Sequence, residues 1–268
     1  MPSPSNIALI TGASSGIGAV YAERLARRGH DLLLVARGAE RLEALAGRLR
    51  RETGRQVETW PADLQDPAAV EALALRLSED AGIAMLVNNA GIAQAGGVLR
   101  TDPARLGAML QLNVQAAARL AQAAAAAFHA RGAGTLVNIA SVLGLAPERF
   151  NAVYAASKAF VLVLSQGLAA ELQGSGVRVQ AVLPGATRTP LWDSAGVDPA
   201  SLPPEMLMAP EAMVDAALAG LDAGELVTIP SLPDMADWQA LETARLALGP
   251  NLSRDIPAPR YRGAADAA

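Results

Sequence analysis

The first long apolar run of the chain leads into a turn rich in glycine, Ile7-Ala8-Leu9-Ile10-Thr11-Gly12-Ala13-Ser14-Ser15-Gly16-Ile17-Gly18. The apolar residues are typical of a buried strand, and the pattern that follows the turn is typical of a helix. Glycines spaced G-x-x-x-G-x-G permit a tight turn, and backbone N–H groups at a helix N-terminus attract a pyrophosphate. A lone glycine-rich turn can also be only a turn with positive φ. Its place at the first strand-to-helix junction favours dinucleotide binding.

Short apolar runs alternate with longer segments of helical period along the rest of the chain, a pattern typical of βαβ units. We expect seven strands, at residues 7–10, 31–36, 56–60, 84–87, 135–140, 178–183 and 225–229. We expect helices at residues 16–28, 39–52, 67–80, 102–130, 152–173, 210–222 and 235–248. The predicted fold class is α/β, with a doubly wound, mostly parallel seven-stranded Rossmann-type sheet in three α/β/α layers.

Residues 1–268 are predicted to form a single dinucleotide-binding catalytic domain, because a chain of this length fits one large core. The segment 185–210 breaks the alternation. It is dense in Pro, Ser, Asp and Gly, with apolar residues between them, which indicates a substrate lid. Residues 230–268 follow the last strand as a C-terminal extension, and the sequence does not indicate its role.

Composition excludes several classes of function. The net charge of −4 gives no basic footprint for nucleic acid. The chain has no cysteine and two histidines, so neither a metal site nor a serine–histidine nucleophile has convincing parts. The start MPSPSN has no basic n-region, and no apolar run reaches about 18 residues. We therefore expect a cytoplasmic protein with no metal, no nucleic acid and no membrane partner.

The second predicted strand ends in Val35-Ala36-Arg37. At this point a dinucleotide-binding fold uses a carboxylate to hold the ribose hydroxyls of NAD, or an arginine to hold the 2′-phosphate of NADP. Here a guanidinium suited to phosphate replaces the carboxylate, and Arg41 could assist. The sequence predicts NADP(H) in preference to NAD(H). The alternative is that Arg37 is a solvated charge where a helix begins.

A tyrosine and a lysine share one face of the predicted helix 152–173, since Tyr154 and Lys158 are four residues apart. An ammonium nearby lowers the pKa of a tyrosine from about 10. Tyr154 would then exchange a proton near neutral pH. An ordinary helix with a surface lysine has the same spacing, but Lys158 is the only lysine among 22 basic residues.

With three further segments, the turn and the Tyr–Lys pair resemble the short-chain dehydrogenase/reductase family from about Ile7 to Thr189. The family order is T-G-x-x-x-G-x-G, N-N-A-G, a lone Asn, a Ser and Y-x-x-x-K, and the three middle segments are Asn88-Asn89-Ala90-Gly91, Asn113 and Ser141. The resemblance implies that Tyr154 is the general acid/base and that Lys158 lowers its pKa and binds the nicotinamide ribose. It implies that Ser141 hydrogen-bonds the substrate carbonyl and that Asn113 holds a water in a proton relay.

The resemblance also implies a set of cofactor contacts, from the turn, the end of the second strand, the D-L and N-A-G segments, the Tyr–Lys pair and the P-G-x-x-x-T segment. These are Gly12, Ser14, Ser15, Gly16, Ile17, Gly18, Arg37, Asp63, Leu64, Asn89, Ala90, Gly91, Tyr154, Lys158, Pro184, Gly185, Thr187 and Thr189. Val142, Leu143, Leu191 and Trp192 flank the catalytic residues and are expected to line an apolar substrate pocket, unless they only pack the lid onto the sheet.

Within the family, the sequence favours NADP(H)-dependent interconversion of an apolar ketone or aldehyde and an alcohol. Enoyl reductases of the family usually space Tyr and Lys by seven residues. A 3-oxoacyl thioester reductase and a catalytically silent NADP(H)-sensing regulator stay open as alternatives. The helix 152–173 is apolar nearly all round between Ala159 and Leu164, which indicates burial against a partner. Because members of the family often form dimers or tetramers, this apolar helix predicts a homodimer or homotetramer.

Overall fold

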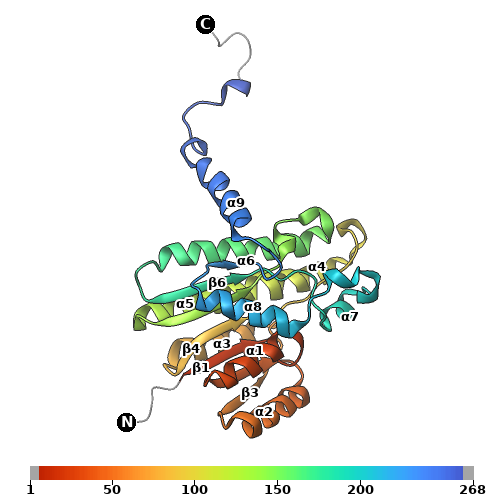
Figure 1. Ribbon diagram of the computed structural model, residues 1–268, viewed down its shortest axis with the longest axis vertical. Coiled ribbons are helices and arrows are strands. Elements are labelled where there is room, and N and C mark those ends of the chain that lie inside the picture. Colours follow the sequence, from red (N-terminus) through yellow and green to blue (C-terminus); the bar gives the residue numbers. More distant parts are fainter. Residues whose placement is uncertain (1–5, 262–268) are drawn as a thin grey trace. The chain divides into compact units, whose positions relative to one another are not determined.

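The computed structural model describes residues 6–261 and contains the predicted doubly wound sheet (Figure 1). Its strands are β1 (Ile7–Thr11), β2 (Asp31–Ala36), β3 (Val57–Pro61), β4 (Ile83–Asn88), β5 (Gly134–Ile139), β6 (Val177–Val182) and β7 (Val227–Thr228). They lie in the order β3-β2-β1-β4-β5-β6-β7, and neighbouring strands are parallel. The α/β prediction with seven strands is confirmed.

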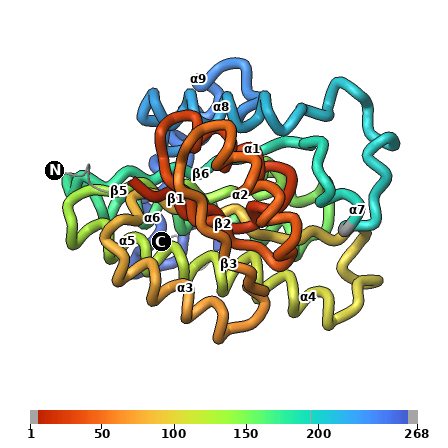
Figure 2. Tube along the Cα trace, turned by 90° about the horizontal axis from the view of Figure 1, so that it is seen from below, coloured from red at the N-terminus to blue at the C-terminus, as the bar shows by residue number. Residues whose placement is uncertain are grey.

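The helices that connect the strands are α1 (Gly16–Arg27), α2 (Ala39–Thr53), α3 (Pro67–Glu79), α4 (Pro103–Leu110), α5 (Ala117–Arg131), α6 (Ala152–Glu171), α7 (Leu191–Ala195) and α8 (Pro210–Asp222). Two apolar clusters join them to the sheet. One contains residues of α1, α2 and α8, and the other contains residues of α3, α5 and α6. Figure 2 shows α8 on one side of the strands and α3 on the other, so the sheet is the middle of three layers.

The strands are apolar in nearly continuous runs because both faces of the sheet are covered. In β1, Ala8 and Ile10 belong to the cluster under α1, α2 and α8, while Leu9 belongs to the opposite cluster. The chain leaves β1 toward β2 and β3 and later returns to β4 on the other side of β1. Such a reversal opens a crevice at the carboxyl ends of the two central strands, where ligands of doubly wound sheets bind.

Two expected elements differ in the structure. The predicted helix 102–130 is interrupted by a π-helical turn, Gln111–Ala116, between α4 and α5. Hydrophobic period does not register a single wider turn, because the apolar face continues on both sides of it. The segment 185–210, which is expected to form a lid, also contains a short helix, α7, which lies near α4 in both views (Figures 1 and 2).

One described helix, α6, is long and apolar enough to cross a membrane by length and composition alone. It packs on β5 and β6, and it buries polar side chains that include Ser157 and Lys158. These are the features of a core helix in a doubly wound fold, so its apolar character follows from packing against the sheet.

The chain divides into two compact units, Met1–Pro230 and Ser231–Ala268. The first unit holds the sheet and α1 to α8. In the second unit, α9 (Met235–Ala247) begins at Asp234, whose carboxylate caps it by accepting from the N–H of Ala236. The boundary coincides with the start of the predicted C-terminal extension. The organisation of residues 1–268 as a single domain stays a prediction.

Candidate active site

The glycine turn is tied to the end of β4 by a threonine hydroxyl and an asparagine amide. Thr11 Oγ1 accepts the backbone N–H groups of Asn89 (2.9 Å) and Ala90 (3.0 Å). Asn89 Nδ2 donates to the carbonyls of Thr11 (2.9 Å) and Gly12 (3.4 Å). The T-G and N-N-A-G segments, about 78 residues apart, therefore form one hydrogen-bonded wall of the crevice.

The turn accepts no side chain at its glycines. Gly12 has φ +67°, and a Cβ there would lie 2.8 Å from Asn89 Nδ2. A Cβ on Gly18 would overlap the carbonyl oxygen of Gly12. The backbone is thus left bare where α1 begins, as close approach to a phosphate requires. The predicted turn residues fit a dinucleotide pyrophosphate at this point.

Two arginines lie at the carboxyl end of β2. Arg37 and Arg41 are exposed, and the Arg41 guanidinium lies against Gly38, where a Cβ would be 3.1 Å from Nη2. In the part of the chain that the structure describes, neither guanidinium forms an ion pair. The residue that directly follows the strand is therefore a cation and not a carboxylate, although exposed Glu40 lies beside Arg41 in the first turn of α2.

Tyr154 and Lys158 lie on α6 with Ser141 just beyond β5, and all three side chains are buried. Lys158 Nζ donates to the carbonyl of Ile139 at 2.9 Å and lies 5.8 Å from the centre of the Tyr154 ring. Ser141 Oγ accepts from the N–H of Leu143 (3.2 Å) and donates to the carbonyl of Pro184 (3.4 Å). The structure therefore brings the predicted Ser, Tyr and Lys together.

Burial dominates the electrostatics of the pair. It raises the pKa of Tyr154 to about 12, although a hydrogen bond with the Ser141 side chain acts to lower that pKa. Burial also lowers the pKa of Lys158 to about 8. The net pKa of Tyr154 is thus raised and not lowered, and the expected stabilisation of a phenolate by Lys158 stays a prediction. The main cause is burial, because a buried phenolate loses the hydration that stabilises its charge.

Asn113 lies in the π-helical turn, and its side-chain amide forms three hydrogen bonds. Its Oδ1 accepts from the N–H of Ile92 (2.9 Å), and its Nδ2 donates to the carbonyl of Ile92 (2.9 Å) and to Ser157 Oγ (3.2 Å). A Cβ on Gly91 would lie 3.2 Å from Asn113 Oδ1 and 3.5 Å from Lys158 Nζ. The side chain therefore joins the end of β4 to α6, and its part in a water relay stays a prediction.

An apolar cluster covers Tyr154. It contains the buried residues Ala93, Met109 and Ala195, with partly buried Ile92, Leu106, Leu143, Phe150, Val153, Leu191 and Val197 packed against them. The Phe150 ring meets the Tyr154 ring edge-on at 5.5 Å between centroids. Of the four predicted pocket residues, Leu143 and Leu191 belong to this cluster, whereas Val142 and Trp192 do not. The Trp192 indole N–H donates to the carbonyl of Thr187 at 2.7 Å instead.

The remaining predicted cofactor residues are spread along the same edge of the sheet. Pro184, Gly185 and Thr187 follow β6, and Thr187 Oγ1 donates to the carbonyl of Gly185 at 3.1 Å. Thr189 lies against the turn, since a Cβ on Gly16 would be 3.1 Å from its Cβ. Three further predicted contacts, Ser14, Ser15 and Ile17, lie in the turn or the first turn of α1, while exposed Asp63 and buried Leu64 follow β3.

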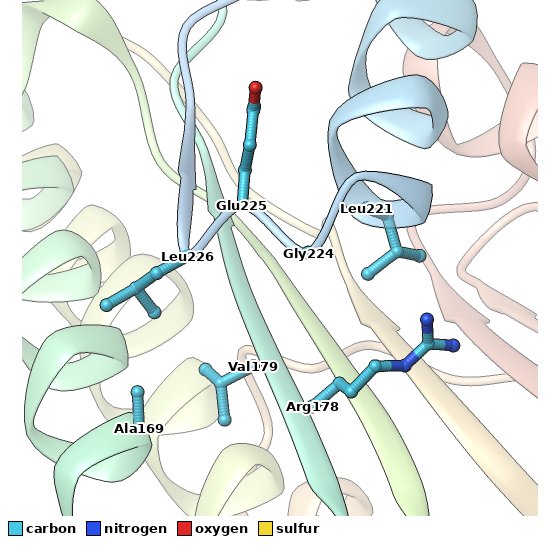
Figure 3. A pocket seen from close by; sticks show the side chains of 7 residues that line it. All are labelled: Ala169, Arg178, Val179, Leu221, Gly224, Glu225 and Leu226. Atoms are coloured by element: carbon cyan, nitrogen blue, oxygen red, sulfur yellow. The ribbon is translucent and has the colours of Figure 1, made fainter. Parts of the chain in front are cut away.

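A groove lies at the opposite end of the strands (Figure 3). Its lining residues come from α6, the amino end of β6, the last turn of α8 and the segment between α8 and β7: Ala169, Arg178, Val179, Leu221, Gly224, Glu225 and Leu226. In Figure 3 the Arg178 side chain points toward Leu221, and the Glu225 side chain points away from the other lining residues. The groove holds none of the predicted site residues, so we place the site at the carboxyl ends.

Sequence reasoning missed Asn151, which is fully buried next to the site. An asparagine at the start of a helical pattern is a recognisable N-cap signal, and Asn151 caps α6. Its other contacts are with Gly96 and Thr101, which are 55 and 50 residues away. Pairings at such separations leave no local pattern in a single sequence.

The family model of short chain dehydrogenases matches residues 6–199 of the chain. The match covers well over half of the chain and spans every strand up to β6. The protein belongs to the short-chain dehydrogenase family, and it is an oxidoreductase with a dinucleotide-binding Rossmann-type fold.

Two solved structures are similar over nearly the whole chain. A short-chain dehydrogenase from Sphingobium yanoikuyae in complex with NADPH is 53% identical with a TM-score of 0.93, covering 96% of this chain and 100% of that one. A bulky-bulky ketone specific alcohol dehydrogenase from Comamonas testosteroni is 45% identical with a TM-score of 0.89, covering 97% and 100%. A curated 7beta-hydroxysteroid dehydrogenase from Clostridium sardiniense is 32% identical over 69% of this chain and 70% of its own length.

Proposed function

We propose that the protein interconverts a ketone that carries two bulky apolar substituents and the corresponding secondary alcohol, with NADP(H) as the redox partner. The observation that carries the proposal is the convergence of Ser141, Tyr154 and Lys158 beneath one apolar cluster, next to a bare glycine turn. The Comamonas testosteroni structure, named for bulky-bulky ketones, supports the substrate class.

Each of the three side chains has a role at the carbonyl. The Ser141 hydroxyl hydrogen-bonds the carbonyl oxygen and holds it beside the phenol of Tyr154. Tyr154 donates its proton to that oxygen as negative charge develops there, and it takes the proton back in the direction of oxidation. Lys158 lies one helical turn away, and its ammonium stabilises the phenolate that forms.

The cofactor, when bound, supplies the hydride that reduces the carbonyl carbon. The glycine turn and the N-terminus of α1 would hold its pyrophosphate, and Arg37 with Arg41 would hold a 2′-phosphate. The Sphingobium yanoikuyae structure with NADPH supports this choice. The apolar cluster on Tyr154 excludes water and accepts the substituents of the ketone.

The experiment that tests the proposal is a substrate panel. NADPH consumption is followed with diaryl ketones, steroid ketones, small aldehydes and a 3-oxoacyl thioester, and each alcohol product is identified by chromatography. Reduction of the bulky ketones supports the proposal. Activity confined to the thioester would replace it with the acyl reductase alternative, and tight NADPH binding without any product would replace it with the sensor alternative.

A further inference from the structure

Asn151 is a fully buried amide that the proposed chemistry does not use. Its Oδ1 accepts hydrogen bonds from the N–H groups of Val153 (3.0 Å) and Tyr154 (3.3 Å). Its Nδ2 donates to the carbonyl of Gly96 (2.9 Å) and to Thr101 Oγ1 (3.2 Å). An asparagine amide has two donors and two acceptor sites, so every one of them is used.

The two sides of this amide have different requirements. Capping the helix needs only an oxygen acceptor, and at α3 and α4 the cap is an aspartate, Asp66 or Asp102, which accepts from the N–H two residues further on. A carboxylate would cap α6 equally well. It would not donate to the carbonyl of Gly96, so the need for an amide comes from the loop side.

The loop held by this donor side is residues 92–101, which forms a wall of the apolar cluster. It begins at Ile92, which binds Asn113 through both of its backbone groups. It continues through Ala93, buried in the cluster with Tyr154, and Ala95, whose N–H donates to the carbonyl of Ala195 in the lid at 3.0 Å. The 92–101 loop thus touches both the catalytic tyrosine and the lid.

We propose that Asn151 is a positioning residue that fastens the 92–101 loop to the start of the catalytic helix. The spacing between the pocket wall and the Tyr154 phenol is then fixed by one side chain. This inference rests on the proposed function for its kinetic consequence. Because the rest of α6 still holds Tyr154, release of the loop weakens the hold on the ketone more than it slows proton transfer.

The test uses two variants and a control. Asn151→Asp keeps the helix cap and removes the donors to Gly96 and Thr101. Thr101→Val removes the hydroxyl oxygen that accepts from Asn151 Nδ2, and it leaves Asn151 itself unchanged. Because Thr101 is partly exposed, this variant can be measured even if the buried carboxylate of Asn151→Asp prevents folding. The control is Asp66→Ala, which removes a cap of the same type from α3.

With a bulky ketone and saturating NADPH, we expect Asn151→Asp to raise KM roughly tenfold, as the loss of buried hydrogen-bond partners implies. We expect kcat to change by less than about threefold, and Thr101→Val to act in the same direction by a smaller factor. Asp66→Ala should lower the thermal midpoint and leave KM and kcat unchanged. A purely structural role for Asn151 would give the result of this control.

A second readout is independent of activity. Amide hydrogen exchange in peptides covering residues 92–101 should accelerate roughly tenfold in Asn151→Asp and remain at the wild-type rate in Asp66→Ala. If KM and loop exchange both stay within twofold of wild type in Asn151→Asp and Thr101→Val, the inference is wrong. If the loop loosens but the wild-type protein reduces no ketone, the link stands and the proposed function fails.

Discussion

Tyr154 and Lys158 are two buried ionisable side chains within one turn of α6, and burial disfavours the charged form of each. Lys158 has no carboxylate partner among the described residues, and its hydrogen-bond partner is the carbonyl of Ile139. An ammonium held in this way costs stability, and a structural position would be served better by an apolar side chain. The presence of the chain's only lysine at this position agrees with a role in the reaction.

Because burial destabilises the charged form of Lys158, the free energy of unfolding depends on pH. The pKa of Lys158 is about 8 in the folded protein and about 10.5 in the unfolded chain, so between these values the unfolded chain binds more protons and stability rises with pH. From pH 7 to 9.5 we expect Lys158 to increase the free energy of unfolding by roughly 2 kcal/mol. Urea unfolding at both pH values measures it. Lys158→Met should lack this increment, and an equal rise in both proteins would contradict the account.

The choice of cofactor depends on Arg37 at the end of β2. Arg37→Asp replaces a phosphate-binding guanidinium with a carboxylate that repels a 2′-phosphate and accepts from ribose hydroxyls. We expect the ratio of kcat/KM for NADPH to that for NADH to fall by roughly tenfold to hundredfold, the range of one or two charge-assisted hydrogen bonds. Parallel assays with both cofactors measure the ratio. An unchanged ratio would assign the phosphate to another group.

Individual site residues were predicted from the order of the motifs along the chain. The structure brings three of them, Ser141, Tyr154 and Lys158, close together. The direction of the Tyr154 pKa was not predictable from spacing. Helical spacing indicates that a lysine is near, whereas the degree of burial follows from the 92–101 loop and the segment 191–197, which are distant in sequence.

The glycine turn and the N-terminus of α1 are proposed to hold the pyrophosphate together. Substitution at Gly18 tests this role. In Gly18→Ala the new Cβ would overlap the Gly12 carbonyl, so the turn must shift. We expect the Kd for NADPH to rise by more than about tenfold, since the backbone N–H groups lose their alignment. Titration calorimetry measures this.

The control for this turn is Gly47→Ala on α2, where a Cβ would meet only the flexible Arg51 side chain at 3.5 Å. It should leave Kd unchanged and stabilise the helix by about 0.5–1 kcal/mol. If both substitutions affect Kd equally, the turn is not the phosphate site.

Strands and helices were predictable where the hydrophobic period was regular. The strand expected at 31–36 and the helix expected at 210–222 have these same bounds in the structure. The π-helical turn at Asn113 was not predictable, because its bonds to Ile92 and Ser157 are long-range. α7 was hidden in a segment whose prolines and glycines indicate a loop.

For the whole molecule, the outer face of α6 predicts self-association. Val163 is 64% exposed and Phe160 38% exposed on a helix with few polar groups, as expected of a surface that a second copy covers. We expect a dimer or tetramer by light scattering, and Val163→Glu should shift it toward the 27.5 kDa monomer. Leu75→Glu on α3, where the leucine is 56% exposed, is the matched control and should not dissociate it. A monomeric wild-type protein would contradict the prediction.

The most direct test of the central claim compares wild type with Tyr154→Phe on one bulky ketone. The substitution removes the phenolic proton and keeps the ring against Phe150. We predict that alcohol formation falls about a hundredfold to ten-thousandfold, the range for loss of a general acid. The Kd for NADPH, measured in the same samples, should stay within a few-fold of wild type. A variant that forms the alcohol at the wild-type rate would show that the proton comes from another group.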